Sequence, residues 1–254
     1  MIHFPVREGI WLFLTLVPFL LAQRILHREI QLLFYSITKS QEIALGLFSL
    51  LFLPGILLHE LSHYLFARLL GVQTGKFSVF PKRIPGGKLQ MGFVETAHTD
   101  WIRTGLIGAA PLLTGILAVG LIAVYGLALE PFLQALSAGN FHELIKGIPT
   151  LLNAPDFWIW FYLAFVISST MLPSETDRSA LLPLMGLTII LVGLIILSGF
   201  GSLLLQTFSY QLQKAIEKAA FVFATSLLIH LILLLPLSLM RFLLSRIFSS
   251  YVSR

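Results

Sequence analysis

The chain lacks cysteine altogether and is poor in charged residues. None of its 254 residues is Cys, and Asp, Glu, Lys and Arg together make up only 11%. Disulfide bonds and thiolate zinc sites are therefore excluded, so any bound metal must be held by nitrogen and oxygen ligands. The sequence also has no glycine-rich phosphate loop and no Ser-His-Asp order, which argues against those two classes of active site.

Hydrophobic residues are abundant instead. They account for 57% of the sequence, with 21 Phe, a composition typical of a multi-pass membrane protein. Stretches of about 20 apolar residues predict helices that cross a hydrocarbon layer about 30 Å thick. We expect six such spans, at residues 10–25, 43–70, 104–129, 157–172, 180–205 and 219–247. The fold class is thus an all-α polytopic membrane protein, with residues 1–254 in one domain and the first span retained as a helix.

Positive charge predicts the orientation, because short loops rich in Lys and Arg stay in the cytoplasm. With six spans, ten Lys and Arg residues fall on the side of both termini and six on the other side. We therefore expect both termini in the cytoplasm of a multi-pass protein in a prokaryotic cell membrane. Flanks that face anionic lipid account for the net charge of +5, so the lipid bilayer is an expected partner and nucleic acid is not.

The second span carries the motif His59-Glu60-Leu61-Ser62-His63. Two histidines four residues apart share one face of a helix and can hold one metal ion, with Glu60 beside them as a general base. Counted from Ile43, His59 lies roughly 24 Å along the helix at about 1.5 Å per residue, so the site is submerged. Each charge near a bilayer centre costs about 2.5 to 3.5 kcal/mol, which favours a functional site over a pair of histidines that neighbouring groups merely satisfy.

The residues that follow extend the motif to HExxHxxxAxxxGV, with Ala67, Gly71 and Val72 at the last three defined positions. This pattern resembles the site-2 protease family of intramembrane zinc metalloproteases. The resemblance implies one zinc ion per chain and hydrolysis of peptide bonds within or near membrane-spanning segments of substrate proteins. In physical terms, Ala67 lies one turn beyond His63, where a small residue lets another helix approach, and Gly71 suits a helix end.

Residues 73–103 form the longest polar interval, and we expect a β-hairpin within it. Segments 76–80 and 89–95 alternate apolar and polar residues on either side of a turn-rich stretch at 81–87. The hairpin is expected to lie at the cytoplasmic interface or to dip into it. A free strand edge there could bind an extended substrate segment, which the resemblance favours, whereas the alternative is a loop that only anchors the protein.

The third span opens with small residues and a proline, between Gly105 and Gly115. It resembles a second family motif, G-x-x-P-x-x-N, whose Asn is thought to contact substrate. Thr114 stands at that Asn position and is the substrate-binding candidate, although a hydroxyl makes fewer hydrogen bonds than an amide. Helix packing through Gly108, Ala109 and Gly115 is the stronger interpretation of this stretch.

The segment after the fourth span resembles the third family motif, in which a helix end broken by proline delivers an Asp as the last zinc ligand. Pro173 would end the helix and free main-chain groups to line a wet cavity. The resemblance makes Asp177 the third metal ligand, with Glu175 as its rival; the alternative is that both acids only cap a helix beginning at Ser179. His230, alone in the last span, is expected to be hydrogen-bonded between helices.

The sequence therefore predicts a zinc-dependent metalloendopeptidase with His59, His63 and Asp177 as ligands and Glu60 as the catalytic residue. Two other functions stay open. One is a non-proteolytic zinc-binding membrane scaffold, in which the departures from the family motifs have cost catalysis. The other is a metal transporter, because His and carboxylate groups inside spans can form an ion path. A structural zinc site has no need of Glu60, which favours the enzyme.

Overall fold

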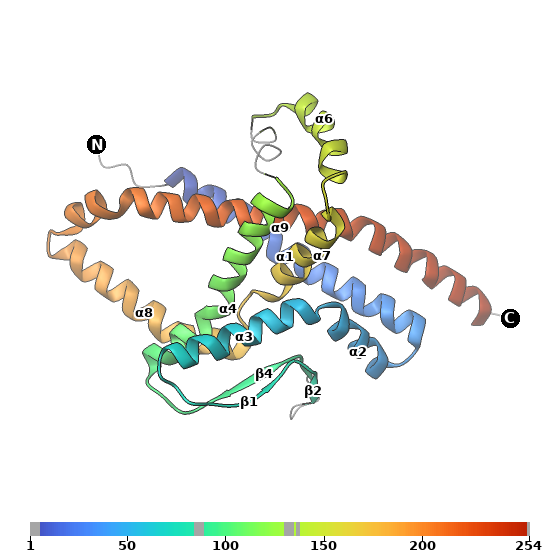
Figure 1. Ribbon diagram of the computed structural model, residues 1–254, viewed down its shortest axis with the longest axis horizontal. Helices are drawn as coiled ribbons and strands as arrows, with labels where there is room; N and C mark the ends of the chain where they lie inside the picture. The colour runs from blue at the N-terminus through green and yellow to red at the C-terminus, as the bar shows by residue number, and fades with distance from the viewer. Residues whose placement is uncertain (1–5, 84–88, 130–134, 136–137, 253–254) are drawn as a thin grey trace.

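The computed structural model describes residues 6–83, 89–129, 135 and 138–252, and it is mostly helical (Figure 1). Its helices are α1 (Val6–Thr38), α2 (Gln41–Leu51), α3 (Leu53–Leu69), α4 (Trp101–Leu121), the π-helical turn η1 (Ile122–Gly126), α6 (Phe141–Leu152), α7 (Phe157–Thr170), α8 (Glu175–Leu197) and α9 (Gly201–Val252). Its strands, which lie between α3 and α4, are β1 (Thr74–Ser78), β2 (Lys82–Arg83), β3 (Leu89–Gln90) and β4 (Phe93–Thr96).

Several helices are long and apolar enough to cross a membrane. Four meet this description: α1, α4 together with η1, α8, and the part of α9 at Thr207–Leu243. The pair α2–α3, which is bent by 70°, adds a fifth if it counts as one span. The expected total of six is not confirmed, because α7, the sixth apolar helix among the described residues, has only 14 residues and extends about 21 Å.

Two expected span boundaries also differ from the observed helices. The first helix continues to Thr38, well past the predicted end at Ile25, because nothing in between breaks it. The helix expected over 180–205 ends at Leu197, where Gly199 takes a φ of +85° and stops it. Residues 201–205 therefore begin α9 instead of ending α8. A count of hydrophobic residues cannot detect this break, because the residues on both sides of it are apolar.

Helices α1 and α9 lie side by side and run in the same direction. Near their starts, Gln213 Nε2 donates a hydrogen bond to Glu8 Oε1 at 3.4 Å. Near their ends, the Arg241 guanidinium pairs with the Glu29 carboxylate. The N-terminal end of α1 thus lies beside the early part of α9, and the two chain ends point away from each other (Figure 1).

This parallel packing bears on the expected membrane topology. If both helices cross the bilayer, the start of α1 and the Lys214 region of α9 lie on one side, and the end of α9 lies on the other. The expectation that both termini lie in the cytoplasm therefore stays an unconfirmed prediction.

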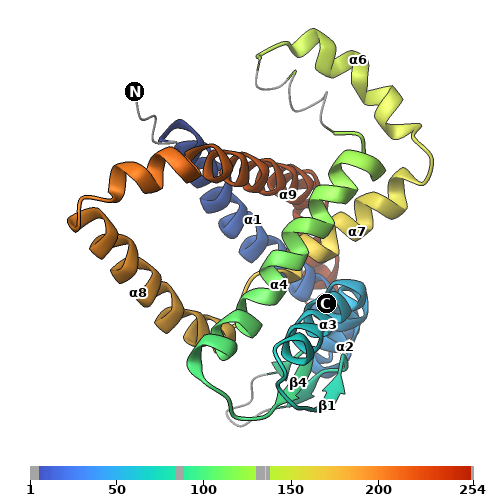
Figure 2. The same ribbon diagram turned by 60° about the vertical axis from the view of Figure 1, so that its left-hand side comes forward.

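The expected hairpin is present, although its ladder is in two parts. β1 pairs antiparallel with β4, and β2 pairs antiparallel with β3. Residues 82–83, expected in the turn, belong to β2, while the expected turn residues 84–87 lie outside the described residues. The hairpin runs along α3, where the Tyr64 and Phe77 rings meet with centroids 6.3 Å apart (Figure 2). It therefore covers one side of the helix that carries the motif.

Buried aromatic rings hold α3 to the rest of the bundle. The Phe48 and Phe52 ring centroids, at the junction of α2 and α3, are 4.5 Å apart. Phe52 also meets Phe165 of α7 at 5.3 Å, and Phe165 meets His230 of α9 at 5.4 Å. Four helices thus share one apolar core, and the candidate site lies next to it.

Candidate metal site

Helix α3 presents the two histidines, and its ends are defined by the sequence. Pro54 stands in the first turn, where its missing N–H costs nothing. At the other end Gly71 has a φ of +71°, and the Val72 N–H donates to the Ala67 carbonyl at 2.8 Å, as in a Schellman motif. Ala67 is fully buried. The expected roles of Ala67 in packing and of Gly71 in ending the helix are confirmed.

Glycines allow the neighbouring helices to approach α3 and one another closely. A Cβ at Gly55 of α3 would overlap the Val166 carbonyl and the Thr170 side chain of α7. A Cβ at Gly108 of α4 would lie 3.1 Å from the main-chain oxygen of Asp177. A Cβ at Gly115 of α4 would overlap the Cβ of Met171, so the packing role expected for Gly108 and Gly115 is confirmed.

The end of α7 supplies the partner of His59. Pro173 has no N–H, so the Ser169 carbonyl four residues earlier loses its helical partner, and Gln23 Nε2 of α1 donates to it at 2.6 Å. The Thr170 carbonyl lacks a helical partner as well, because the N–H four residues later, that of Ser174, donates to Asp177 Oδ2 at 2.9 Å instead. His59 Nδ1 lies 2.7 Å from that carbonyl oxygen.

Helix α8 begins with a capping box that also places Asp177. The Ser174 side chain accepts from the Asp177 N–H at 3.2 Å, and Asp177 Oδ2 accepts from both the N–H and the hydroxyl of Ser174. The helix starts at Glu175, earlier than the expected start at Ser179. Helix capping and membership of the metal group are alternatives in the sequence analysis, but in the structure Asp177 does both. Glu175 is exposed and is not part of the group.

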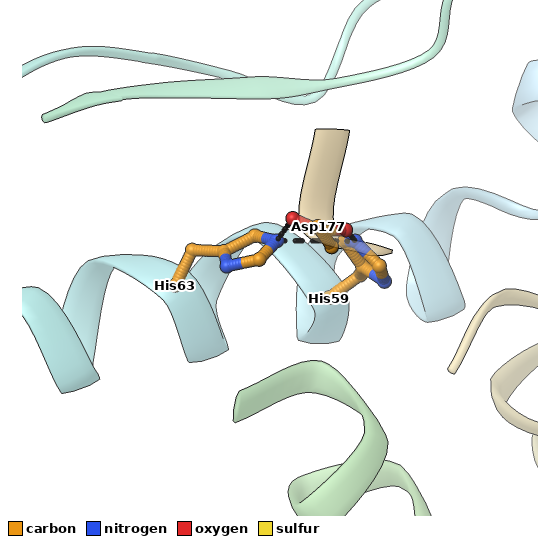
Figure 3. A group of neighbouring side chains, drawn as sticks. All are labelled: His59, His63 and Asp177. Atoms are coloured by element: carbon orange, nitrogen blue, oxygen red, sulfur yellow. Dashed lines mark hydrogen bonds and ion pairs between the residues drawn. The ribbon is translucent and has the colours of Figure 1, made fainter. Parts of the chain in front are cut away.

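The two histidines and Asp177 converge on one point (Figure 3). His59 Nε2 and His63 Nε2 are 3.3 Å apart, and they lie 3.5 and 3.3 Å from the Asp177 oxygens Oδ2 and Oδ1. Their side chains are only 11–12% exposed. Ligand atoms about 2.0–2.1 Å from a tetrahedral ion stand about 3.3–3.4 Å apart, so these spacings fit one ion held by two nitrogens and an oxygen.

The ring hydrogen bonds leave both Nε2 atoms available to a metal. His63 Nδ1 lies 2.9 Å from the Ile107 carbonyl oxygen, and His59 Nδ1 lies 2.7 Å from the Thr170 carbonyl oxygen. A carbonyl only accepts, so each Nδ1 carries the proton and each neutral ring directs a lone pair from Nε2 toward Asp177. Two nitrogen lone pairs and a carboxylate that face one another in a buried place repel, so a cation or a proton is needed among them. The group could therefore bind a metal ion.

Glu60 lies next to this group and under the hairpin. It is 8% exposed, and its carboxylate interacts electrostatically with His59, His63 and Asp177. A Cβ at Gly92, the residue before β4, would lie 2.7 Å from Glu60 Oε1. The hairpin backbone can lie this close to the carboxylate because Gly92 has no side chain.

Thr114, the substrate-binding candidate, is used for helix contacts in this structure. Its hydroxyl lies 2.5 Å from Ser62 Oγ of α3 and donates to the Ala110 carbonyl at 2.9 Å. His230 behaves as expected, with Nε2 3.0 Å from Ser169 Oγ and Nδ1 2.7 Å from the Ser226 carbonyl.

Sequence reasoning missed the carbonyls of Thr170 and Ile107 and the glycine above Glu60. Both carbonyls had a local signal. Pro173 breaks the helix just beyond Thr170, and Pro111, four residues after Ile107 in α4, has no N–H to donate to the Ile107 carbonyl.

Comparison of the chain with protein-family models, with curated proteins and with solved structures finds no match. The function must therefore be inferred from the motif residues and the geometry of the site.

Proposed function

We propose that the protein is an intramembrane zinc metalloprotease that hydrolyses peptide bonds within or near membrane-spanning segments of other proteins. The observation that carries the proposal is the convergence of His59, His63 and Asp177 beside Glu60 in a bundle of apolar helices. The resemblance of the HExxHxxxAxxxGV pattern to the site-2 protease family supports the same reaction.

In this proposal His59, His63 and Asp177 hold the metal. Two imidazole nitrogens and one carboxylate oxygen are a donor set typical of catalytic zinc, whereas calcium and magnesium prefer oxygen alone. Zinc in such a site supplies Lewis acidity, which polarises a carbonyl and makes water more acidic. The main-chain carbonyls of Thr170 and Ile107 hold the proton of each ring on Nδ1, which leaves Nε2 as the atom that binds a metal.

Glu60 is the proton carrier. Its carboxylate accepts a proton from the attacking water and then donates it to the amine that leaves when the peptide C–N bond breaks. The position of Glu60 between α3 and the hairpin supports this role, because a substrate strand beside β4 would pass close to it. A helical substrate hides its carbonyls, so an extended segment that adds to the hairpin edge is the form we expect to be cleaved.

The variant Glu60→Gln tests the proposal. Purified protein would be reconstituted in liposomes with single-span peptides that carry helix-destabilising residues near their centre. We expect the wild type to cleave at least one such peptide and Glu60→Gln to lose about 10²- to 10⁴-fold in rate, because general acid–base catalysis contributes that much. The variant should keep its zinc, since Glu60 is not a ligand.

Other outcomes point to the alternative functions. Equal cleavage by Glu60→Gln and wild type would contradict the role of Glu60. Zinc bound at one ion per chain without cleavage of any peptide would favour the scaffold, and zinc flux across the liposome membrane would favour the transporter.

A further inference from the structure

Helix α6 is amphipathic, and three of its apolar side chains, Ile145, Ile148 and Leu152, are exposed. Within Phe141–Leu152, apolar residues recur every three or four positions, while His142, Glu143 and Lys146 occupy the other side of the helical wheel. Ile145 is 69% exposed and Ile148 is 42% exposed. Figures 1 and 2 show α6 standing apart from the other helices. Ile145, Ile148 and Leu152 thus form an exposed apolar stripe, and such a surface typically marks an interaction site.

Aromatic residues at the two neighbouring helix ends indicate what covers it. Tyr125, on η1, is 82% exposed, and Trp158, at the start of α7, is 69% exposed. The two ends lie side by side, because a Cβ at Gly126 would lie 2.7 Å from the Trp160 ring. Tyr and Trp are enriched where a membrane meets water. The helix composed of α4 and η1 is a candidate span that ends at Gly126, so a membrane surface is expected near this end.

We propose that α6 lies in this membrane surface, with Ile145, Ile148 and Leu152 in the boundary between headgroups and acyl chains. Its short tethers support this, since α6 begins soon after the span that ends at Gly126 and ends just before α7. Its exposed polar side carries one acid and one base, Glu143 and Lys146, so binding depends on apolar burial more than on anionic lipid. The binding partner is therefore the phospholipid bilayer itself.

The absence of native cysteine makes a direct test possible. Single-cysteine variants Ile148→Cys and Lys146→Cys would be spin-labelled in the full chain and reconstituted in vesicles of phosphatidylcholine and phosphatidylglycerol. We expect the label at 148 to collide several-fold more with oxygen than with a water-soluble nickel complex, and the label at 146 to show the reverse. Ile189→Cys, on the exposed apolar surface of α8, is the lipid-facing reference.

Two results would overturn the proposal. Nickel access at both 146 and 148 would mean that α6 lies in water. Shielding of 148 from both reagents would mean that protein covers it, and dipolar broadening that disappears on dilution with unlabelled protein would identify a second copy. The test requires no cleavage, so it is independent of the proposed protease activity, and circular dichroism of each labelled variant confirms that it is folded.

Discussion

The bundle holds two pairs of histidines with opposite environments. His59 and His63 meet a carboxylate, and each uses only Nδ1 for a main-chain hydrogen bond. His27 and His230 lie among the aromatic rings of the core, where His27 meets the Phe48 ring at 5.4 Å. Both nitrogens of His230 have protein partners, whereas Nε2 of His27 has none.

This comparison shows what distinguishes a histidine in a candidate metal site from a histidine that only packs in the core. A histidine within an apolar bundle becomes a ligand when one nitrogen is fixed by a carbonyl and the other points at an anionic group. Four residues of spacing bring His59 and His63 together, but the carbonyls and Asp177 come from other helices. Both nitrogens of His230 are already hydrogen-bonded, and no carboxylate in the described part of the chain pairs with His27.

Loss of the metal is the largest expected effect. Asp177→Ala and His63→Ala should each reduce bound zinc from about one ion per chain to background, because two remaining ligands do not hold the ion against competing chelators. The matched control is His27→Leu, which should keep its zinc. Elemental analysis of purified proteins after dialysis measures the outcome. Normal zinc content in Asp177→Ala would remove Asp177 from the ligand set.

The next effect concerns Glu60 and separates catalysis from metal binding. Gly92→Ala places a methyl group 2.7 Å from Glu60 Oε1, so either the carboxylate or the hairpin must shift. A displacement of about 1 Å costs on the order of 10² in rate, and we expect that loss of cleavage with unchanged zinc content.

Gly46→Ala is a suitable control for this variant, because nothing lies within 4 Å of a Cβ at Gly46. Normal cleavage by Gly92→Ala would show that the position of the hairpin above Glu60 is unimportant for the reaction.

These residues also show how far the sequence could lead. The pairing of His59 with His63 follows from helical spacing, and the end of α3 at Gly71 follows from local backbone preference. Asp177 was reached only through a family resemblance, since no local rule links it to the motif. The carbonyls of Thr170 and Ile107 depend on how α7 and α4 pack against α3, which hydrophobic pattern does not encode.

The same limit applies to helix boundaries and to the direction in which the helices run. Apolar windows locate candidate spans, but they miss a helix break such as the one at Gly199. They also give no information on the relative direction of helices. The contacts of Glu8 with Gln213 and of Glu29 with Arg241 set the parallel direction of α1 and α9, and these form only in the folded chain.

Replacing His27 and replacing His230 should change the stability of the protein in opposite directions. His27→Leu removes a buried Nε2 without a partner, so we expect a gain of about 1 kcal/mol in the free energy of unfolding. His230→Leu leaves the buried Ser169 hydroxyl without the partner it has in His230, so we expect a loss of about 1–3 kcal/mol. Reversible unfolding in mixed micelles would measure both, and the same sign for both variants would contradict the distinction between the two residues.

The smallest effect compares two aspartates at helix starts. Asp100 caps α4 by accepting from the Arg103 N–H at 2.9 Å, and this hydrogen bond holds the pKa of Asp100 below its usual value. A carboxyl with a lowered folded-state pKa stabilises the fold above its unfolded-state pKa and loses that contribution as the pH falls through the folded-state pKa.

Asp100→Ala should therefore be slightly less stable than wild type at pH 7, and the difference should shrink below about pH 4. Zinc content should stay unchanged, in contrast to Asp177→Ala. A stability difference that persists undiminished at low pH would mean that Asp100 acts through packing and not through its charge.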